Sequence, residues 1–438
     1  MLPDYLAKAK PNSAANRAPW YVNTAPTYAG VFLWVAFYQS MASGTLDRGG
    51  VALCLGALVV AGLLSYGLFY YVPAMLGMKT GYPLYVVGSS TFGTTGGYLM
   101  PGLLMGLLQV GWFAVGTFFS TRFILTGLGM SATPGTPAFI VVALLWGYTM
   151  AYIGVKGIQY VAKVSLYLNM IPLLMLLLVF FQTQSGISKY VPPNPDPFAA
   201  FTLLIQIVIG FFATAGAAGA DFGMNSRNQS DVKWGGLVGI SGAVLYAGGL
   251  PILSVAGALA LNPSLGSMSY DAVIGSLGGF IASAMLFLFA IASIGPACFC
   301  AFIAGNSFST MIPGVSRMAS TMAGVTVAIL LAITGYAENL VSFFTIVGAS
   351  FGPICGAMAA DYLLSGKKWA GPREGVNIAG YGSWALGFLV GVLPFLPVSP
   401  EVKTYAQPAV VYSFITGFVV YWLLAKAGLQ SKTVSMPA

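Results

Sequence analysis

The sequence predicts an all-helical integral membrane protein with twelve transmembrane helices. Three observations support this fold class: the composition, the length of the apolar runs and the placement of the basic residues. Of the 438 residues, 58% are apolar and only 6% are charged, and the mean hydropathy is +0.84. A soluble domain carries about 25% charged residues because its surface faces water. A chain with so few charges is expected to face lipid instead.

A helix needs about 20 mostly apolar residues to cross the hydrocarbon core of a bilayer, and the chain contains twelve such runs. We therefore expect a cytoplasmic segment over 1–26, one membrane domain over 27–427 and a cytoplasmic tail over 428–438. No connection between the runs is long enough for a soluble domain. The predicted spans are 27–46, 51–76, 101–127, 136–155, 159–182, 199–223, 234–260, 272–305, 319–335, 340–364, 375–398 and 407–427.

The basic residues indicate the orientation, because cytoplasmic loops are enriched in Lys and Arg. With the N-terminus in the cytoplasm, four basic residues lie outside: Arg48, Arg122, Lys189 and Lys403. The other fourteen lie inside, so both termini are expected on the cytoplasmic side of the cell membrane. The inside set is Lys8, Lys10, Arg17, Lys79, Lys156, Lys163, Arg227, Lys233, Arg317, Lys367, Lys368, Arg373, Lys426 and Lys432.

The same composition argues against other classes of protein. The formal charge of +8 is spread singly between apolar runs, so no basic patch for nucleic acid forms. The chain has no histidine and its four cysteines lie in apolar stretches, so we expect no bound metal, no disulfide and no cofactor. An enzyme would need clustered acids, histidines or nucleophiles at one depth, and a channel would need a filter or charged rings. The sequence contains neither pattern.

Two spans contain stretches of small residues that weaken a helix: Gln39–Gly44 in the first and Thr214–Ala220 in the sixth. Such stretches allow a helix to unwind, and the freed backbone groups can then bind a substrate or an ion near the bilayer midplane. They also allow close helix packing. The first and sixth spans hold equivalent positions in two halves of five helices. This coincidence favours an inverted-repeat transporter with broken helices, followed by two accessory helices.

The third span carries Gln109 and Trp112, which are three residues apart and so share a helix face. A glutamine in hydrocarbon is costly unless it is hydrogen-bonded, so it either bonds a neighbouring helix or meets a ligand. Its amide donates and accepts at once, which suits the edge of a heteroaromatic ring. An indole one turn away can stack on such a ring. From these residues alone, structural bonding and ligand contact both remain open.

Asp221 and Asp361 are the only acids inside the predicted spans. An acid in a membrane is a functional candidate by default, so proton coupling is open for Asp221. A structural or gating role is the alternative, because the polar turn Asn225–Asn228 follows Asp221 and can bond to it. No charged residue lies at the expected midplane site. We therefore expect a small, uncharged substrate and a monomeric protein.

Several blocks of the sequence resemble a known family. Thr91–Pro101, followed by Gln109–Phe113, is similar to the signature that runs into the third helix of the nucleobase–cation symporters. Gly210–Phe222 is similar to their sixth helix, and Phe351–Pro353 with Ala360–Leu363 is similar to their tenth. Within this purine/cytosine permease family, the chain most closely resembles the bacterial cytosine permeases.

The resemblance implies a twelve-helix fold with a five-plus-five inverted repeat, similar to the LeuT architecture, with two accessory helices. It implies secondary active import of a nucleobase by alternating access. It also assigns the substrate site to Gln109, Trp112, Phe212, Thr214 and Phe37.

Two departures from the family pattern leave the substrate and the ion open. Val87–Ser90 stands where the family has an arginine, and Ile291–Cys298 lacks the asparagine and threonines of the eighth helix. A related heterocycle such as a hydantoin, allantoin or a pyrimidine vitamin precursor is therefore an alternative to cytosine. The resemblance places a sodium site at the carbonyls around Leu33–Ala36 and at Ser293, the one hydroxyl of its stretch. Proton coupling through Asp221 is the alternative to sodium coupling.

Overall fold

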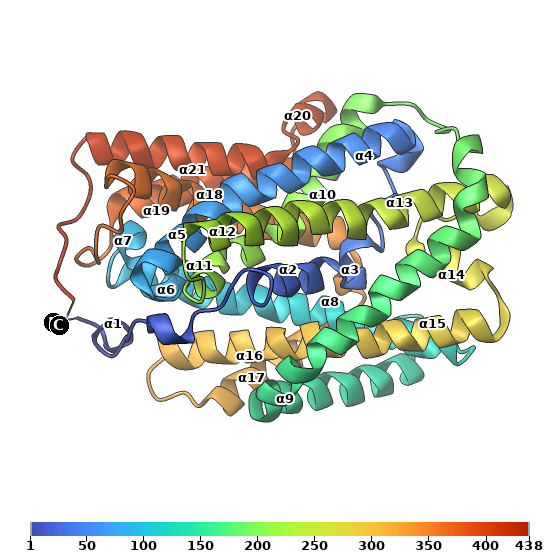
Figure 1. Cartoon of the computed structure of the whole chain (residues 1–438), viewed down its shortest axis with the longest axis horizontal. Coiled ribbons are helices and arrows are strands. Elements are labelled where there is room, and N and C mark those ends of the chain that lie inside the picture. The colour runs from blue at the N-terminus through green and yellow to red at the C-terminus, as the bar shows by residue number, and fades with distance from the viewer. Residues whose placement is uncertain (1, 437–438) are drawn as a thin grey trace.

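The computed structural model describes residues 2–436, without the side chains of six residues between 158 and 166. Lys163, which belongs to the predicted inside set, is one of these six, and the last two residues of the 428–438 tail also lie outside the described part. Long helices run side by side along the long axis of the molecule (Figure 1). The first short helix, α1 (Asp4–Ala7), and the C-terminus lie at the same end, which we call the terminal end.

Among the described residues, nine helices are long and apolar enough to cross a membrane, and two shorter ones are also apolar. The first predicted span is formed by two short helices, α2 and α3, on either side of a break. Together with the eleven helices above, this span is consistent with twelve spans. The helices that build the spans are α2 (Thr24–Phe32), α3 (Val35–Tyr38), α4 (Leu46–Leu64), α5 (Tyr71–Thr80), α8 (Leu104–Gly127), α9 (Pro137–Thr183), α10 (Pro197–Ala217), α11 (Gly219–Gly223), α12 (Gln229–Gly236), α13 (Ala243–Leu261), α15 (Gly279–Ala292), α16 (Ile294–Met311), α17 (Arg317–Ile333), α18 (Leu340–Leu364), α19 (Ile378–Gly391) and α21 (Ala409–Lys426).

The remaining helices are short and connect the spans. Among them, α14 lies between the seventh and eighth spans, and α6 and α7 lie between the second and third. The short helices after α1 are α6 (Leu84–Val87), α7 (Ser89–Phe92), α14 (Tyr270–Ser276) and α20 (Pro400–Tyr405).

Most predicted spans agree with the observed helices, and two boundaries differ for a physical reason. The predicted loop between the fourth and fifth spans is a bend inside α9 at Gly157, where φ is −128° and ψ is 18°. The eighth span begins later than predicted, because Gly278 and Gly279 have φ values of 71° and 57° and separate α14 from α15. Glycine tolerates this left-handed backbone at little cost, so an apolar run can continue through a break.

The first, sixth and eighth spans are interrupted, and the break in the eighth lies at Ser293, between α15 and α16. The first breaks at Leu33 and Trp34, before the predicted stretch Gln39–Gly44, which forms turns. Trp34 has extended backbone, with φ −70° and ψ 129°, and its indole lies over Gly116 of α8. A Cβ atom at Gly116 would lie 3.2 Å from Trp34 Cζ2, so the glycine makes room for the ring. The sixth span breaks at Ala218, inside the predicted stretch.

The helices form two groups with a third set alongside. In the first group, α8 packs against α15, α16 and α17, and the first half of α9 joins them. In the second group, α4 packs against α10 and α13, α5 packs against α11, and α2 packs against the start of the seventh span. Each group thus contains equivalent spans from both halves of the predicted repeat. Helices α18, α19 and α21 pack together against α10, on the side of the second group (Figure 1).

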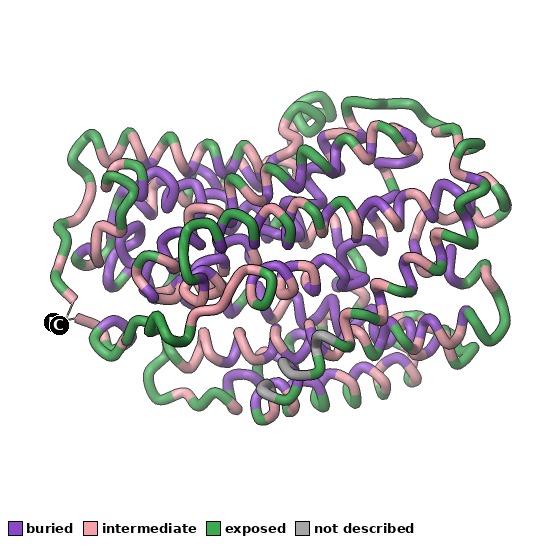
Figure 2. The backbone as a smooth tube through the Cα atoms, viewed as in Figure 1, coloured by how far each residue is buried: buried purple, intermediate pink, exposed green. Residues whose placement is uncertain are grey.

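The outward faces of the helices are apolar. Figure 2 shows buried backbone along the inner faces of the helices and exposed backbone on the outer faces and at both ends. Leu145 and Phe181 are 66% and 61% exposed, and many other large apolar side chains are also exposed. A water-exposed surface of this kind would be unfavourable, whereas lipid accommodates it. The protein is therefore a multi-pass membrane protein.

Candidate functional site

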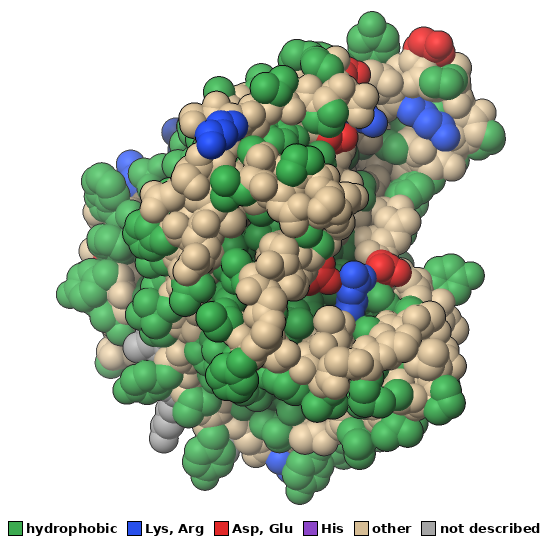
Figure 3. Space-filling view, turned by 90° about the vertical axis from the view of Figure 1, so that its right-hand side faces the viewer, with side chains coloured by type: hydrophobic (Ala, Val, Ile, Leu, Met, Phe, Trp, Pro, Cys, Tyr) green, Lys and Arg blue, Asp and Glu red, His purple; other side chains and the backbone are tan. Residues whose placement is uncertain are grey.

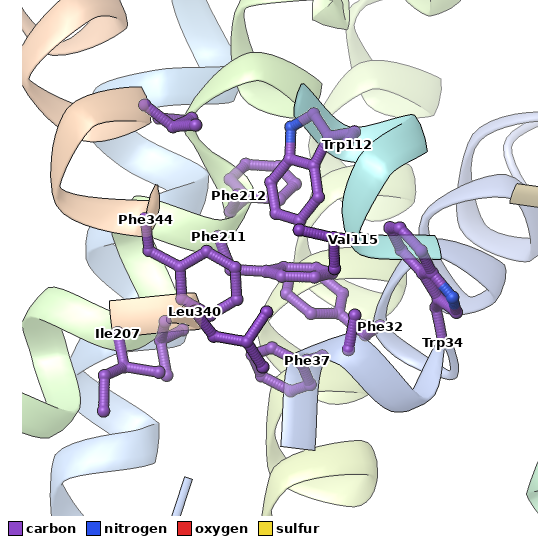
Figure 4. Close-up of a cluster of buried hydrophobic side chains, with 14 of the residues drawn as sticks. Phe32, Trp34, Phe37, Trp112, Val115, Ile207, Phe211, Phe212, Leu340 and Phe344 are labelled. Atoms are coloured by element: carbon purple, nitrogen blue, oxygen red, sulfur yellow. The ribbon is translucent and has the colours of Figure 1, made fainter. Parts of the chain in front are cut away.

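A cluster of buried aromatic side chains lies between the two helix groups (Figure 4). Trp112 of α8 is at its centre and is only 4% exposed. The ring centroids of Phe211 and Phe344 lie 5.1 Å and 5.5 Å from that of Trp112, and Trp34 lies 5.7 Å away. The cluster therefore joins α8 to α10, to α18 and to the break in the first span.

A hydrogen bond crosses this cluster. The indole Nε1 of Trp112 donates to Thr214 Oγ1 at 3.1 Å, and both side chains are buried. This bond fixes the plane of the indole relative to α10, because a ring held at one edge cannot rotate freely. The Thr214 hydroxyl can still donate its own proton to a ligand. The structure thus brings together two of the residues named from the sequence, one from each helix group.

Gln109 lies one turn before Trp112 on the same face of α8 and is 8% exposed. Among the described residues, its amide makes a single hydrogen-bond contact, from Nε2 to Met105 Sδ at 3.7 Å. Sulfur is a weak acceptor, and buried polar groups in proteins are otherwise nearly always paired. The side chain therefore keeps most of its hydrogen-bonding capacity free for a ligand. This geometry favours the ligand-contact interpretation over structural bonding.

Phe212 and Phe37 lie in a second layer of the cluster. The Phe212 ring stacks on Phe32 at 5.4 Å and 16°, and Phe37 contacts Phe211 at 4.9 Å. The residue that lies against Trp112 is Phe211, and the sequence could have predicted this contact. Phe211 and Thr214 are three residues apart and share a helix face, whereas Phe212 and Thr214 are two apart and do not.

Trp34 and Phe344 also belong to the cluster, and sequence reasoning did not name them. The break at Trp34 has no local sequence signal, since neither glycine nor proline stands there. Phe344 lies near the start of α18 and reaches Trp112 only through tertiary packing. The gap bounded by Phe37, Ile207 and Phe344 has no room for a water molecule. The aromatic rings thus fill the centre, and the site is closed.

The residues named for a coupling ion lie at or beside helix interruptions. Leu33 ends α2, Ala36 lies in the single turn α3, and Ser293 separates α15 from α16. The Ser293 hydroxyl donates to the carbonyl of Phe289 at 2.9 Å and is buried. The oxygen of this hydroxyl keeps a free lone pair, which is what a cation would need.

Asp221 lies toward the terminal end, in α11. One of its carboxylate oxygens, Oδ1, accepts from the backbone N–H of Leu84, at the start of α6, at 3.2 Å. The turn after Asp221 was expected to bond the carboxylate. Instead, Asn225 Nδ2 donates to the backbone carbonyl of Asp221 at 3.1 Å. Arg227 pairs with Asp231 instead, at 2.8 Å. Asp221 therefore connects α11 to α6 and contacts no basic side chain among the described residues.

Asp361 is the centre of a buried network that the sequence did not predict. Its carboxylate pairs with Arg373 at 3.0 Å and accepts from Ser90 Oγ at 2.7 Å and from Tyr421 OH at 2.9 Å. Arg373 also donates from Nε to the Ser90 carbonyl at 2.8 Å. These contacts join α18, the loop after it, α21 and the connection between α5 and α8. A buried and fully paired carboxylate of this kind indicates a structural role.

Interrupted helices that meet at a buried site between two packed groups define a class of membrane protein, the secondary transporters. A family model described as the permease for cytosine/purines, uracil, thiamine and allantoin matches residues 12–371. The chain belongs to this family, which confirms the resemblance to nucleobase–cation symporters. It is thus a transporter and not an enzyme.

Similar proteins are consistent with this assignment. The cytosine permease of Escherichia coli K12 is 25% identical over 353 residues, which are 77% of this chain and 78% of that protein. The solved structure of Mhp1, a nucleobase-cation-symport-1 family transporter in a closed conformation with bromovinylhydantoin bound, has a TM-score of 0.70 at 16% identity and 98% coverage of both chains. Inward-facing Mhp1 has a TM-score of 0.72 at 15% identity, covering 99% of this chain and 97% of that one. These structures confirm the LeuT-like fold.

Proposed function

We propose that this transporter imports a neutral, planar nucleobase or a closely related heterocycle across the cell membrane. The observation that carries the proposal is the buried amide of Gln109, which has only a sulfur contact and lies one turn from Trp112. A flat ring with adjacent donors and acceptors can stack on the indole and pair with this amide at once. The contacts of Trp112 are with aromatic rings and with the neutral Thr214 hydroxyl, which supports a neutral substrate.

Substrate entry requires a rearrangement of the aromatic cluster. The Phe344 ring lies 5.5 Å from Trp112 with an interplanar angle of 32°, so it covers a face of the indole. A planar substrate would replace Phe344 on that face, while the Trp112–Thr214 hydrogen bond keeps the indole in place. Stacking of a base on an aromatic side chain is worth about 1–3 kcal/mol. Gln109 then reads the edge of the ring.

Cytosine is the first candidate substrate because the relatives named as cytosine permeases cover most of the chain. A hydantoin, allantoin or a pyrimidine vitamin precursor is the second candidate. The observation that favours it is the Ile291–Cys298 stretch, which has no amide side chain to pair with a cytosine edge. Its one hydroxyl, on Ser293, already donates to Phe289.

We infer that a cation drives uptake, and we favour a proton over sodium. Sodium prefers several oxygen ligands, by the logic that applies to other hard cations. Ser293 is the one hydroxyl of its stretch, so at least one expected ligand oxygen is missing. Asp221 is the candidate proton carrier, since its carboxylate has no basic partner among the described residues. Facilitated transport without an ion is the remaining alternative.

Uptake into proteoliposomes tests the substrate and the ion together. Labelled cytosine, uracil, hydantoin and allantoin are supplied first under a sodium gradient at constant pH, and then under a pH gradient without sodium. We expect saturable uptake of at least one compound, driven by the pH gradient and reduced by Asp221→Asn. Uptake of none of them would refute the substrate class, and strong stimulation by sodium alone would refute the proton assignment.

The orientation is a separate proposal, with both termini in the cytoplasm. Its support is the placement of fourteen basic residues toward one side of the membrane. Cysteines introduced at Lys79 and Lys367 should react only from inside, and one introduced at Lys189 should react from outside. Reaction of the Lys367→Cys variant from outside intact cells would reverse the topology.

A further inference from the structure

The N-terminal segment crosses the terminal end of the molecule and touches both helix groups. We call residues 4–18 the N-terminal strap. It begins with α1, contains a 3₁₀ turn at Ala14–Asn16 and ends at Ala18, which pairs with Ser226 in an isolated β-bridge. Figure 1 shows this segment passing over the ends of the helices. The segment is polar in sequence, yet its first and second halves are each held by specific contacts.

The first half of the strap is fixed to the group that contains α8 and α16. Tyr5 OH donates to the Thr94 carbonyl at 2.7 Å, and its ring packs edge-on against Tyr98 at 5.0 Å, just before α8. Leu6 is fully buried in a small apolar cluster with Met311, the last residue of α16. This cluster is separate from the main core. Leu6 thus anchors the strap to α16 of the first group, and Tyr5 anchors it to the segment before α8, which is also bonded to the loop after α18.

The second half is fixed to the group that contains α5 and α11. The Asn12 backbone N–H donates to the Gly81 carbonyl at 2.9 Å, directly after α5. Its side-chain Nδ2 donates to the Met224 carbonyl at 3.1 Å and to Asn225 Oδ1 at 2.8 Å, directly after α11. Ala18 N donates to the Asn225 carbonyl at 2.8 Å. Asn12 thus bonds the chain after both helices, and Arg17 Nη1 adds a hydrogen bond to the Met78 carbonyl of α5 at 2.8 Å.

The chain between the two anchors is short. Five residues lie between Leu6 and Asn12, and an extended chain covers at most about 3.6 Å per residue. Beneath this bridge lies an open hollow of about 460 Å³. It is lined from the strap by Lys10, Asn12 and Asn16 and from the transporter by Gly81, Tyr85 and Met224. The hollow therefore lies between the strap and the chain around α5, α6 and α11, on the terminal side of the second group.

We propose that the N-terminal strap is a latch that holds the two helix groups together at the terminal end, and that its Asn12 anchor has to release before the site opens to that side. Alternating access requires the groups to separate at one end while they close at the other. A short chain fixed to both groups opposes that separation. This proposal depends on the protein being a transporter that works by alternating access, and it does not depend on which substrate is carried.

The latch sets the balance between the closed state and the state open at the terminal end. Each hydrogen bond lost from the Asn12 side chain should shift this balance by roughly 2- to 10-fold toward the open state. Lys8 provides a matched control on the same segment. Within the described part of the chain its ammonium pairs only with Asp4 of α1, at 2.7 Å, and both side chains are about four-fifths exposed.

Thiol labelling tests the balance without any substrate. A Met224→Cys reporter is placed in a background whose four buried native cysteines are replaced by alanine. A membrane-impermeant maleimide is then applied to the terminal side in inside-out vesicles. Asn12→Ala should raise the labelling rate about 5- to 30-fold, whereas Lys8→Ala should change it less than about 2-fold. Equal labelling of all three proteins would overturn the latch.

Cross-linking tests whether release is required for transport. A short bifunctional thiosulfonate should bridge Asn12→Cys and Asn225→Cys, whose native side chains are in contact. We expect the bridge to stop uptake and a reductant to restore it. The pair Asp4→Cys and Lys8→Cys, bridged within α1, should leave uptake unchanged. Full uptake by the bridged Asn12/Asn225 pair would overturn the proposal. If labelling shows the effect of Asn12→Ala but the protein transports no nucleobase, the latch stands and only the proposed substrate class is refuted.

Discussion

The two ends of the molecule are closed in different ways. At the terminal end, the N-terminal strap, the Asp361–Arg373 pair and the C-terminal tail lie over one another, and most of their hydrogen bonds involve backbone groups. The opposite end, which faces the viewer in Figure 3, carries few charged side chains, and these lie in small groups. There, one arginine joins three elements through exposed ion pairs. The ion pair at the terminal end, Asp361–Arg373, is buried, whereas the ion pairs of Arg122 at the opposite end are partly exposed.

The C-terminal tail adds a second connection at the terminal end. Glu374 N donates to the Lys432 carbonyl at 2.8 Å, and Val434 N donates to the Pro372 carbonyl at 2.8 Å. Arg373, between these positions, donates from Nη1 to the Ser431 carbonyl at 3.2 Å. The loop after α18 is thus fixed by the tail on one side and by Asp361 on the other. Such a loop cannot move alone.

At the opposite end, Arg122 at the end of α8 pairs with Asp271 of α14 at 3.1 Å and with Glu338, just before α18, at 2.9 Å. The Arg122 side chain is 31% exposed, and those of Glu338 and Asp271 are 54% and 11% exposed, so the pair with Glu338 is the one in contact with water. Ion pairs in contact with water contribute about 0–1 kcal/mol each. Opening at this end therefore costs less than opening at the terminal end. We expect the empty protein to open more often at the opposite end, which the proposed orientation places outside the cell.

The largest expected effect tests whether the terminal end is the rigid one. Removing one member of a buried ion pair leaves the other charge unpaired, which typically costs about 3–5 kcal/mol. Arg373→Ala should therefore lower the free energy of unfolding by about this amount, measured by thermal or denaturant unfolding in detergent. Glu374→Ala, an exposed neighbour, is the control and should be neutral. If the Arg373→Ala protein is as stable as the Glu374→Ala control, the terminal end is not the more rigid of the two ends.

An intermediate effect is expected at the substrate site between the ends. Gln109→Ala should weaken substrate binding by about 1–3 kcal/mol, because a buried hydrogen bond is lost, which is roughly 5- to 150-fold in affinity. Trp112→Ala should have an effect of similar size. Neither variant should change labelling at either end. Gln184→Ala, which removes an exposed glutamine at the end of α9, is the control. Unchanged apparent affinity in both variants, measured by uptake or calorimetry, would show that the site lies elsewhere.

The smallest effect is expected at Arg122. Arg122→Gln removes both ion pairs and should raise the labelling of a Ser40→Cys reporter from the opposite end by roughly 1.5- to 5-fold. The difference in labelling rate between the Arg122→Gln protein and the protein that keeps Arg122 should shrink in 1 M salt, because salt screens exposed charges. Arg48→Gln is the control, because Arg48 lies at the same end and makes no ion pair within residues 2–436. A salt-independent difference would mean that packing, and not charge, closes this end.

The spans were predictable because each crosses a bilayer and must be apolar over about 20 residues, whatever its neighbours are. Leu340–Leu364, which was predicted to the residue, is an example. The breaks were less predictable. Ala218 lies in a stretch rich in small residues, whereas the break at Trp34 depends on the room that Gly116 provides on a distant helix. A single sequence contains no local signal for such a contact.

The site was predictable in part for the same reason. Gln109 and Trp112 share a helix face, and Trp112 does bond Thr214 of α10. Phe211 was within reach of the same periodicity argument and was missed, while Phe344 approaches only in the folded protein. The Asp361–Arg373 pair depends on how the loop after α18 folds back, which spacing alone does not determine. Contacts within one helix follow from the sequence, and contacts between helices largely do not.

The strap also has a consequence for biosynthesis. Its residues leave the ribosome first, but Asn225 and Met311, which it contacts, are made far later. At about 5–20 residues per second, the wait between Ala18 and Met311 is roughly 15–60 s. During this interval Leu6 lacks its contact with Met311 of the eighth span, whereas the partners of Tyr5 at Thr94 and Tyr98 are made earlier. The terminal end can therefore close only after most of the spans have entered the membrane, so the first residues to be synthesised are among the last to reach their final positions.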